Sequence, residues 1–303
     1  MDSQPMEIKI WLSAFRLRTL PLALSCICMG GFLAAAAGKF DGLIFALCCL
    51  TTVFLQILSN LANDYGDSVN GADHPDRKGP LRSVQSGAIS SSQMKKVVIF
   101  FIALCLVTGI SLLVVSLGWN LRNLFFFLGL GLLSILAAIT YTVGRKPYGY
   151  SGLGDISVLI FFGLVGVMGS QYLFTQQLTG YTVLPALSCG LFSIAVLNIN
   201  NIRDIESDRQ AGKFSIPVRI GKEKASYYHW FLLVTGWLSA LAYTFLVYES
   251  PVQFLFLLSF PLFLINGLAV HKKSPEDLDP YLRQMALSTL LFVILFGSGN
   301  LLR

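Results

Sequence analysis

Long apolar runs separated by short polar segments dominate the hydrophobic pattern of this 303-residue chain. A helix needs about 20 apolar residues to cross the hydrocarbon core of a bilayer, and nine runs reach that length. Lipid offers the backbone no hydrogen-bond partner, and no strand-like alternation is visible, so each run is expected to be a helix. The pattern therefore predicts an all-α fold, a polytopic membrane helical bundle of nine transmembrane helices. The runs lie near residues 11–37, 42–63, 96–118, 121–143, 152–174, 181–200, 227–248, 251–271 and 283–302.

The composition agrees with this interpretation. Hydrophobic residues make up 54% of the chain and charged residues only 13%, whereas an ordinary soluble domain has roughly 25% charged residues. All six cysteines lie inside apolar runs without the spacing of a zinc site, so we expect them to be small packing residues. The first apolar run is too long for a cleavable signal peptide.

Basic residues are distributed unevenly between the two sides of the predicted bundle. With nine spans, 19 of the 22 Lys and Arg residues fall on the side of the N-terminus, and Lys39, Arg122 and Arg303 fall on the other. Positively charged loops stay in the cytoplasm. The pattern predicts a multi-pass protein of the cell inner (plasma) membrane, with a cytoplasmic N-terminus and an outside C-terminus. The basic residues form five scattered loop groups, so no nucleic-acid partner is expected.

Two acidic clusters end apolar runs on the predicted cytoplasmic side, in motif loops 64–95 and 201–226. The first cluster reads Asn60-x-x-Asn63-Asp64-x-x-Asp67, followed by Asp73 and Asp76. The second reads Asn200-Asn201-x-Arg203-Asp204-x-x-x-Asp208. A carboxylate at the end of a membrane span is costly unless it has a partner. The two clusters therefore indicate a functional site.

The spacing within each cluster favours a metal site. Residues four apart share one face of a helix, so Asn63 and Asp67 would form one polar stripe, and Asn200, Asp204 and Asp208 another. Two facing stripes of oxygen atoms suit Mg²⁺, which commonly bridges carboxylates to the phosphates of a substrate. The candidate metal ligands are Asp64, Asp67, Asp73, Asp204 and Asp208.

Basic and aromatic residues at the same membrane face are candidates for binding a diphosphate. Arginine suits bidentate binding of phosphate oxygens, although each basic residue also has a simpler role in fixing membrane orientation. The candidates are Arg82, Arg145, Lys146, Lys213, Arg203 and Tyr141.

A diphosphate bound at the surface of so apolar a protein indicates a polyprenyl diphosphate whose tail enters from the membrane lipid. A bound cation would draw charge from the departing diphosphate, and aromatic ring faces would stabilise the allylic cation. A divalent-cation or anion transporter is the alternative from another class, but a transporter places its acids near the bilayer midplane. A membrane scaffold would leave the acidic clusters unexplained. Isoprenoid chain elongation of the soluble type shares the aspartate-rich motifs but would not need nine membrane spans.

Three segments carry a resemblance to a known family. NLANDYGDSVNGADHPDR (60–77) and NINNIRDIESDRQAGKFSIPVRIG (198–221) resemble the two aspartate-rich signatures of the UbiA superfamily of intramembrane aromatic prenyltransferases. YTVGRKPYGYSGLGD (141–155) resembles its short loop between the fourth and fifth spans. The similarity extends over nearly the whole chain in span number and motif placement, so residues 1–303 are expected to form a single transmembrane prenyltransferase domain. The form of these segments is most similar to the menaquinone branch.

The resemblance implies Mg²⁺-dependent transfer of a long prenyl chain to 1,4-dihydroxy-2-naphthoate, with loss of CO₂ to give demethylmenaquinone. Asn63 and Asp67 match the first motif of the family, and Asn200, Asp204 and Asp208 match the second. Another aromatic acceptor, such as 4-hydroxybenzoate, stays open, because the metal site would be the same.

Two positions are ambiguous under this resemblance. Many members carry an aspartate four residues after the position of Asp67, but residue 71 is glycine here and the next acid is Asp73. Asp155 either orients the acceptor or caps the helix of the fifth span.

Overall fold

The computed structural model describes residues 4–70 and 82–303. Within these ranges, nine helical segments are long and apolar enough to cross a membrane, and no strand is present, which confirms the predicted fold class. The elements are α1 Gln4–Phe15, η1 Leu17–Thr19, α2 Leu20–Ala36, α3 Gly42–Val69, α4 Ser91–Leu117, α5 Leu121–Thr140, η2 Tyr148–Ser151, α6 Gly154–Val158, η3 Leu159–Gly169, α7 Ser170–Thr175, η4 Gly180–Thr182, α8 Val183–Arg203, α9 Ile205–Gln210, α10 Ile216–Leu246, η5 Pro251–Ser259, α11 Phe260–Lys272, η6 Pro275–Leu278 and α12 Asp279–Leu301.

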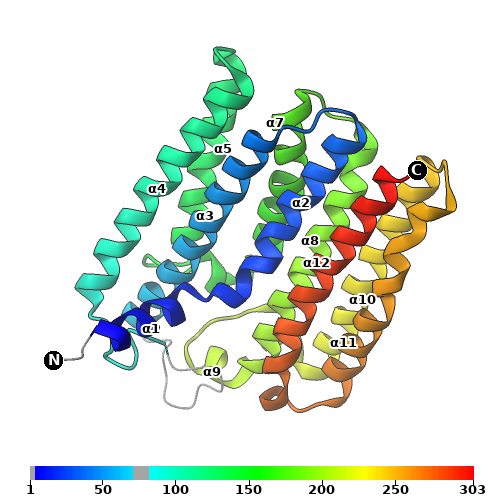
Figure 1. The fold of residues 1–303 in the computed structure, drawn as a ribbon. Helices are drawn as coiled ribbons and strands as arrows, with labels where there is room; N and C mark the ends of the chain where they lie inside the picture. The colour runs from blue at the N-terminus through cyan, green and yellow to red at the C-terminus, as the bar shows by residue number, and fades with distance from the viewer. Residues whose placement is uncertain (1–3, 71–81) are drawn as a thin grey trace.

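The helices run side by side as a bundle (Figure 1). Helices α3, α4 and α5 stand on one side, α8, α10, α11 and α12 on the other, and α2 between them. The short helices α1 and α9 lie at the same end of the bundle, and the C-terminus lies at the opposite end, as an odd number of spans requires.

Helix α3 continues beyond the predicted end of its span at residue 63 and stops only at Val69. The C-terminal end of α3 is attached to the segment that follows α5, because the Asn70 side chain donates a 2.7 Å hydrogen bond to the carbonyl of Thr142. A Cβ at Gly66 would lie 2.7 Å from the backbone of Thr142, so only glycine permits this approach. The part of the first acidic motif from Asn60 to Asp67 therefore lies within a helix rather than in a loop.

The second motif spans a break. Helix α8 ends at Arg203, Asp204 forms the junction, and α9 begins at Ile205. One-turn hydrogen bonds nevertheless continue through the junction, from Asp204 N to Asn200 O at 3.1 Å and from Asp208 N to Asp204 O at 2.8 Å. The helix is interrupted at Asp204, but the one-turn spacing of Asn200, Asp204 and Asp208 on which the predicted polar stripe was based persists.

The packing is dense around α8, of which 78% of the apolar stretch is buried. Helix α8 approaches η3 at a pair of glycines, where a Cβ on Gly163 would lie 3.2 Å from the Cα of Gly190. Small residues at such a crossing let membrane helices pack closely. Aromatic rings fill the core behind it, as where Phe192 meets Phe292 edge to face with ring centroids 5.1 Å apart.

Helix α5 differs from α8, because none of its residues is buried. It packs against α3 and α4, whereas its contacts with α6 and η3 are sparse. On the other side, α6 and η3 pack on α8, and η3 also packs on α2. A space therefore remains between the group of α3, α4 and α5 and the group of α2, α6, η3 and α8.

Candidate functional site

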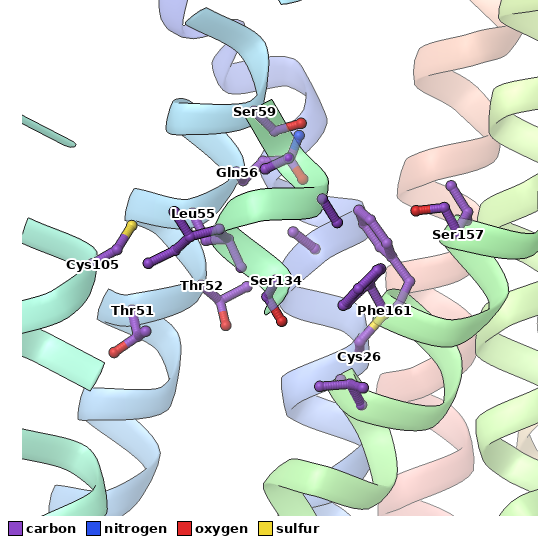
Figure 2. Close-up of a pocket in the computed structure, with 18 of the residues that line it drawn as sticks. Cys26, Thr51, Thr52, Leu55, Gln56, Ser59, Cys105, Ser134, Ser157 and Phe161 are labelled. Carbon is purple, nitrogen blue, oxygen red and sulfur yellow. The ribbon is translucent and has the colours of Figure 1, made fainter. Parts of the chain in front are cut away.

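A cavity of about 440 Å³ occupies this space, with walls from α2, α3, α4, α5, α6 and η3. Its lining is mainly apolar, and Figure 2 shows the side chains of Leu55 and Phe161 on opposite walls with Ser134 between them. The charged and amide residues of the lining gather near the C-terminal end of α3 and the α8–α10 junction. The polar lining at that end comprises Arg16, Asn63, Asp67, Arg82, Tyr141, Asn200 and Lys213.

Among the motif carboxylates of residues 4–70 and 82–303, Asp67 is the one that lines this cavity. It is only 3% exposed, and it accepts a 2.7 Å hydrogen bond from the hydroxyl of Tyr150 and an ion-pair contact from Nη1 of Arg82. Burial raises the pKa of Tyr150, and the neighbouring Asp67 raises it further, so this hydroxyl keeps the proton that it donates. Two donors from different segments thus stabilise one buried carboxylate.

The neighbours of Asp67 on α3 have different surroundings. Oδ1 of Asn63 accepts a 3.2 Å hydrogen bond from the hydroxyl of Thr142. Asp64 is buried behind the cavity wall, where Oδ2 accepts from the backbone amide of Ser83 at 3.2 Å. Its other oxygen is buried without a hydrogen-bond partner among the described residues.

Arg203 organises the first half of the second motif. Its guanidinium binds Asp204 in a bidentate manner, with nitrogen–oxygen distances of 3.0 and 2.8 Å. It also donates to Oδ1 of Asn200 at 2.9 Å and to Asp279 of α12. Arg203 and Asp204 are both 3% exposed and neither lines the cavity, so this pair joins α8 to α12 behind the site.

Asp208 pairs with Lys213, whose Nζ lies 3.1 Å from the carboxylate oxygens. Lys213 lines the cavity and Asp208 does not. Burial raises the pKa of Asp208, Lys213 opposes this rise, and the charges of Asp204 and Asp67 add to it. Carboxylates of both motifs therefore share one electrostatic neighbourhood. Burial lowers the pKa of Lys213, but Asp208, Tyr141 and Asp67 together raise it more, so the ammonium stays charged.

The carboxylate and amide oxygens of these residues are the kind of ligand that a hard divalent cation binds. Buried carboxylates are costly unless paired, and three motif carboxylates each have a basic partner: Asp67 on the cavity lining pairs with Arg82, and behind the wall Asp204 pairs with Arg203 and Asp208 with Lys213. No three His, Cys, Asp or Glu side chains of residues 4–70 and 82–303 converge into a ready-made metal site. The oxygen donors that would hold Mg²⁺ are Asn63, Asp67 and Asn200, which line the cavity, together with Asp204 and Asp208 behind its wall.

Tyr141 lies at the junction between the polar end and the apolar body. It follows the last residue of α5 and lines the cavity. Burial raises its pKa to about 12, so its ring is neutral at physiological pH. Its ring packs edge to face on Tyr148, with centroids 5.4 Å apart.

Other predicted residues do not reach the cavity. Arg145 and Lys146 are exposed and are not part of its lining. Asp155 does not cap α6; it is buried and accepts a 2.8 Å hydrogen bond from the hydroxyl of Tyr228, which ties α6 to α10. Asp73 lies outside the described residues.

The sequence interpretation missed Tyr150 and Arg16. Tyr150 lies in the short segment between the fourth and fifth spans that was singled out, but no pattern links it to an aspartate 83 positions away. Arg16 adopts a left-handed backbone conformation with φ of 49°, which interrupts the first span between α1 and η1 and places this residue on the cavity lining.

Comparisons with known proteins agree with this geometry. Residues 23–294 match the sequence profile described as the UbiA prenyltransferase family. The chain is 47% identical to a 1,4-dihydroxy-2-naphthoate octaprenyltransferase of Haemophilus influenzae, over 98% of this chain and 97% of the relative. It is 45% identical to the enzyme of that name from Escherichia coli, with the same coverage. A UbiA homologue from Archaeoglobus fulgidus, solved bound to GPP and Mg²⁺, superposes with a TM-score of 0.61 at 18% identity, over 96% of this chain and all of that one.

Proposed function

Because the chain belongs to the UbiA prenyltransferase family, we propose that it transfers a polyprenyl group from a polyprenyl diphosphate to 1,4-dihydroxy-2-naphthoate. The naphthoate loses CO₂ without a change of oxidation state, so the direct product is the quinol, demethylmenaquinol, whose oxidised form is demethylmenaquinone, an intermediate of menaquinone biosynthesis. The two relatives named above, similar over almost their whole length, support this acceptor.

The observation that carries the proposal is the division of one cavity into a charged end and an apolar body. The charged end lies at the ends of α3 and α8, next to the polar segments of the chain. An amphiphile with a diphosphate head and a hydrocarbon tail matches both parts. A transporter would place its ionisable residues near the middle of the bilayer, whereas those of the motifs lie at helix ends.

The basic residues of the lining would bind the head of the donor. Arg82 and Lys213 both line the cavity, and each is held next to a motif carboxylate. When bound, Mg²⁺ would supply Lewis-acid stabilisation of the departing diphosphate. Arg82 and Lys213 would stabilise the same negative charge by direct contact with phosphate oxygens.

The apolar body would protect the allylic group. Leu55, Phe161 and the neutral ring of Tyr141 exclude water from this region, and a ring face next to an allylic cation stabilises it. The acceptor needs no strong base from the protein, because its two hydroxyls donate electron density to the ring and the loss of CO₂ replaces the loss of a proton.

The proposed location is the inner membrane with the charged end of the cavity toward the cytoplasm. The concentration of basic residues on the side of the N-terminus supports this orientation.

A direct assay tests the proposal. Purified protein in lipid nanodiscs receives octaprenyl diphosphate, Mg²⁺ and either 1,4-dihydroxy-2-naphthoate or 4-hydroxybenzoate, and products are identified by mass spectrometry. We expect CO₂ and demethylmenaquinol, detected as demethylmenaquinone after oxidation in air, with the naphthoate and no prenylated product with the benzoate. Prenylation of the benzoate alone would overturn the proposed acceptor but leave the family assignment intact.

A further inference from the structure

A chain of four charged side chains lies next to the second motif and extends beyond it. Arg18 of η1 donates to Asp279, the first residue of α12, at 3.3 Å, and Asp279 also accepts from Nη1 of Arg203. Arg203 in turn pairs with Asp204. The two basic and two acidic groups balance each other. The network therefore joins η1, α12 and the α8–α9 junction at the end of the bundle where α9 lies (Figure 1).

The guanidinium of Arg203 is divided between two carboxylates. Nε and Nη2 bind the two oxygens of Asp204 at 3.0 and 2.8 Å, while Nη1 donates to Asp279. The two partners have different surroundings, because the side chain of Asp204 is 3% exposed and that of Asp279 is 38% exposed. Arg203 therefore has one buried partner inside the motif and one hydrated partner outside it.

The pairing of Arg203 with Asp204 competes with cation binding. Arg203 occupies both oxygens of this carboxylate, and a divalent cation on the same oxygens would repel the guanidinium at short range. An arginine that gave up Asp204 without another partner would be a buried, unpaired charge, which is strongly destabilising. Asp279 prevents this, because it already accepts from one end of the guanidinium.

We propose that Asp279 is a positioning residue for the second motif, which holds Arg203 while Asp204 binds the cation. The inference rests on the proposed function for the presence of a cation. Arg18 opposes the exchange, because it pairs with the same carboxylate of Asp279. The exchange also reaches the cavity lining, since Asn200 lines the cavity and its Oδ1 accepts from Nη2 of Arg203 at 2.9 Å.

Binding of Mn²⁺ alone to the full-length protein in lipid nanodiscs tests the proposal without turnover. Electron paramagnetic resonance measures free Mn²⁺ as the protein is titrated, which gives a dissociation constant. Asp279→Asn leaves Arg203 with Asp204 as its carboxylate partner in the network, so the dissociation constant should rise about tenfold, within the usual range for coupled equilibria.

Asp277→Asn is the matched control. It removes the same charge two residues earlier, but Asp277 is exposed and accepts from Ser274 rather than from the network. The effect of Asp279→Asn is measured relative to this variant, so that a general loss of negative charge at this end of the bundle cancels. Asp279→Glu keeps the charge and should bind Mn²⁺ as the wild type does.

Arg18→Gln tests the opposite direction. Without Arg18, the carboxylate of Asp279 is fully available to Arg203, so the dissociation constant for Mn²⁺ should fall. Arg209→Gln is its control, because Arg209 is an exposed arginine of α9 that pairs with Glu206. Arg18→Gln leaves both carboxylate partners of Arg203 in place and therefore tests the exchange even if Asp279→Asn does not fold.

A double variant separates a positioning residue from a structural brace between α8 and α12. In an Arg203→Gln background, Asp279→Asn should change Mn²⁺ binding no more than Asp277→Asn does, because Asp279 acts through Arg203. A brace would instead lower the Tm of Asp279→Asn in the native background and leave its Mn²⁺ affinity at the control value.

Equal Mn²⁺ affinities of Asp279→Asn and Asp277→Asn, or a wild type that binds no Mn²⁺, would overturn the inference. A wild type that binds Mn²⁺ with the expected differences but does not prenylate the naphthoate would overturn the proposed function and leave the exchange at Arg203 standing.

Discussion

In the first motif, Asp67 receives its hydrogen bonds from residues 15 and 83 positions away in the chain, whereas in the second motif Asp204 and Asp208 pair with basic residues one and five positions away. The first arrangement exists only when α3, the segment after it and the η2 turn have come together. The second is largely contained within α8, α9 and the turn that follows.

The two motifs also present different groups to the cavity. The first presents its carboxylate directly, through Asp67. The second keeps Asp204 and Asp208 behind the wall and presents Asn200 and Lys213, which these carboxylates position or balance. On this comparison we propose that the first motif would bind the cation most directly and that the second motif would also position the positive charge that meets the diphosphate.

Chelation would remove the cation that the two motifs share, and of all the changes considered it should lower turnover the most. In excess EDTA we expect turnover to fall below detection, because the buried carboxylates and the diphosphate would then repel each other. The measurement is demethylmenaquinone formation, with readdition of Mg²⁺ as the control. Undiminished turnover in EDTA would refute a metal-dependent site in either motif.

Asp67→Asn tests the direct role of the first motif. The substitution keeps the shape but removes the charge, and kcat/KM should fall by about 10²–10³-fold, the usual loss for one group that stabilises a transition state electrostatically. Asp64→Asn is the control on the same helix, since Asp64 is buried but does not line the cavity. Equal losses in the two variants would show that burial, rather than position on the cavity, determines the effect.

Lys213→Met tests the indirect role of the second motif. It leaves Asp208 buried and unpaired, which should lower the free energy of unfolding by about 3–5 kcal/mol. Adding Asp208→Asn should recover most of this stability but not the activity, because the charge at the diphosphate is still missing. Thermal unfolding and kcat/KM of the single and double variants decide the question. Recovery of activity in the double variant would mean that the pair only supports the fold.

Arg203→Lys should have a smaller effect on activity, of about tenfold or less. Lysine keeps the charge but cannot bind Asp204 in a bidentate manner and reach Asn200 as well, so about 1.5–3 kcal/mol of stability is expected to be lost. A loss as large as that of Asp67→Asn would show that Arg203 contacts the substrate.

The smallest effect is expected from Arg145→Ala and Lys146→Ala. Both side chains are exposed and outside the cavity lining, and surface substitutions usually change free energies by less than about 0.5 kcal/mol, or roughly twofold in kcat/KM. A tenfold rise in KM for the donor would show that these residues bind the diphosphate after all.

The sequence predicts the spans well, because any segment in lipid has to satisfy its backbone hydrogen bonds internally and therefore forms a helix, whatever its neighbours are. It predicts that Asp67, Asp204 and Asp208 lie at one end of the bundle, because topology alone puts span ends together. It does not predict the individual partners. The contact of Tyr150 with Asp67 depends on how η2 folds back on α3, and Arg203, next to the break at Asp204, pairs with both Asp204 and the distant Asp279.

Asp155 shows the same limit. Its position before an apolar run allows a helix cap or contact with the acceptor, yet it pairs with Tyr228 on a helix more than 70 residues later. A single sequence records the type of each residue, but not which of several polar partners will lie within reach once the helices pack.

The η2 turn has a consequence for inhibitor design. Tyr148 lines the cavity, and Tyr150, two residues later on the same short turn, donates a hydrogen bond to Asp67. A compound that mimics only the pyrophosphate and one that mimics only the isoprenoid should therefore not act independently. We expect each to alter the potency of the other, so that dose–response surfaces for the pair depart from simple additivity, and molecules linking both features should gain more than the two halves supply separately.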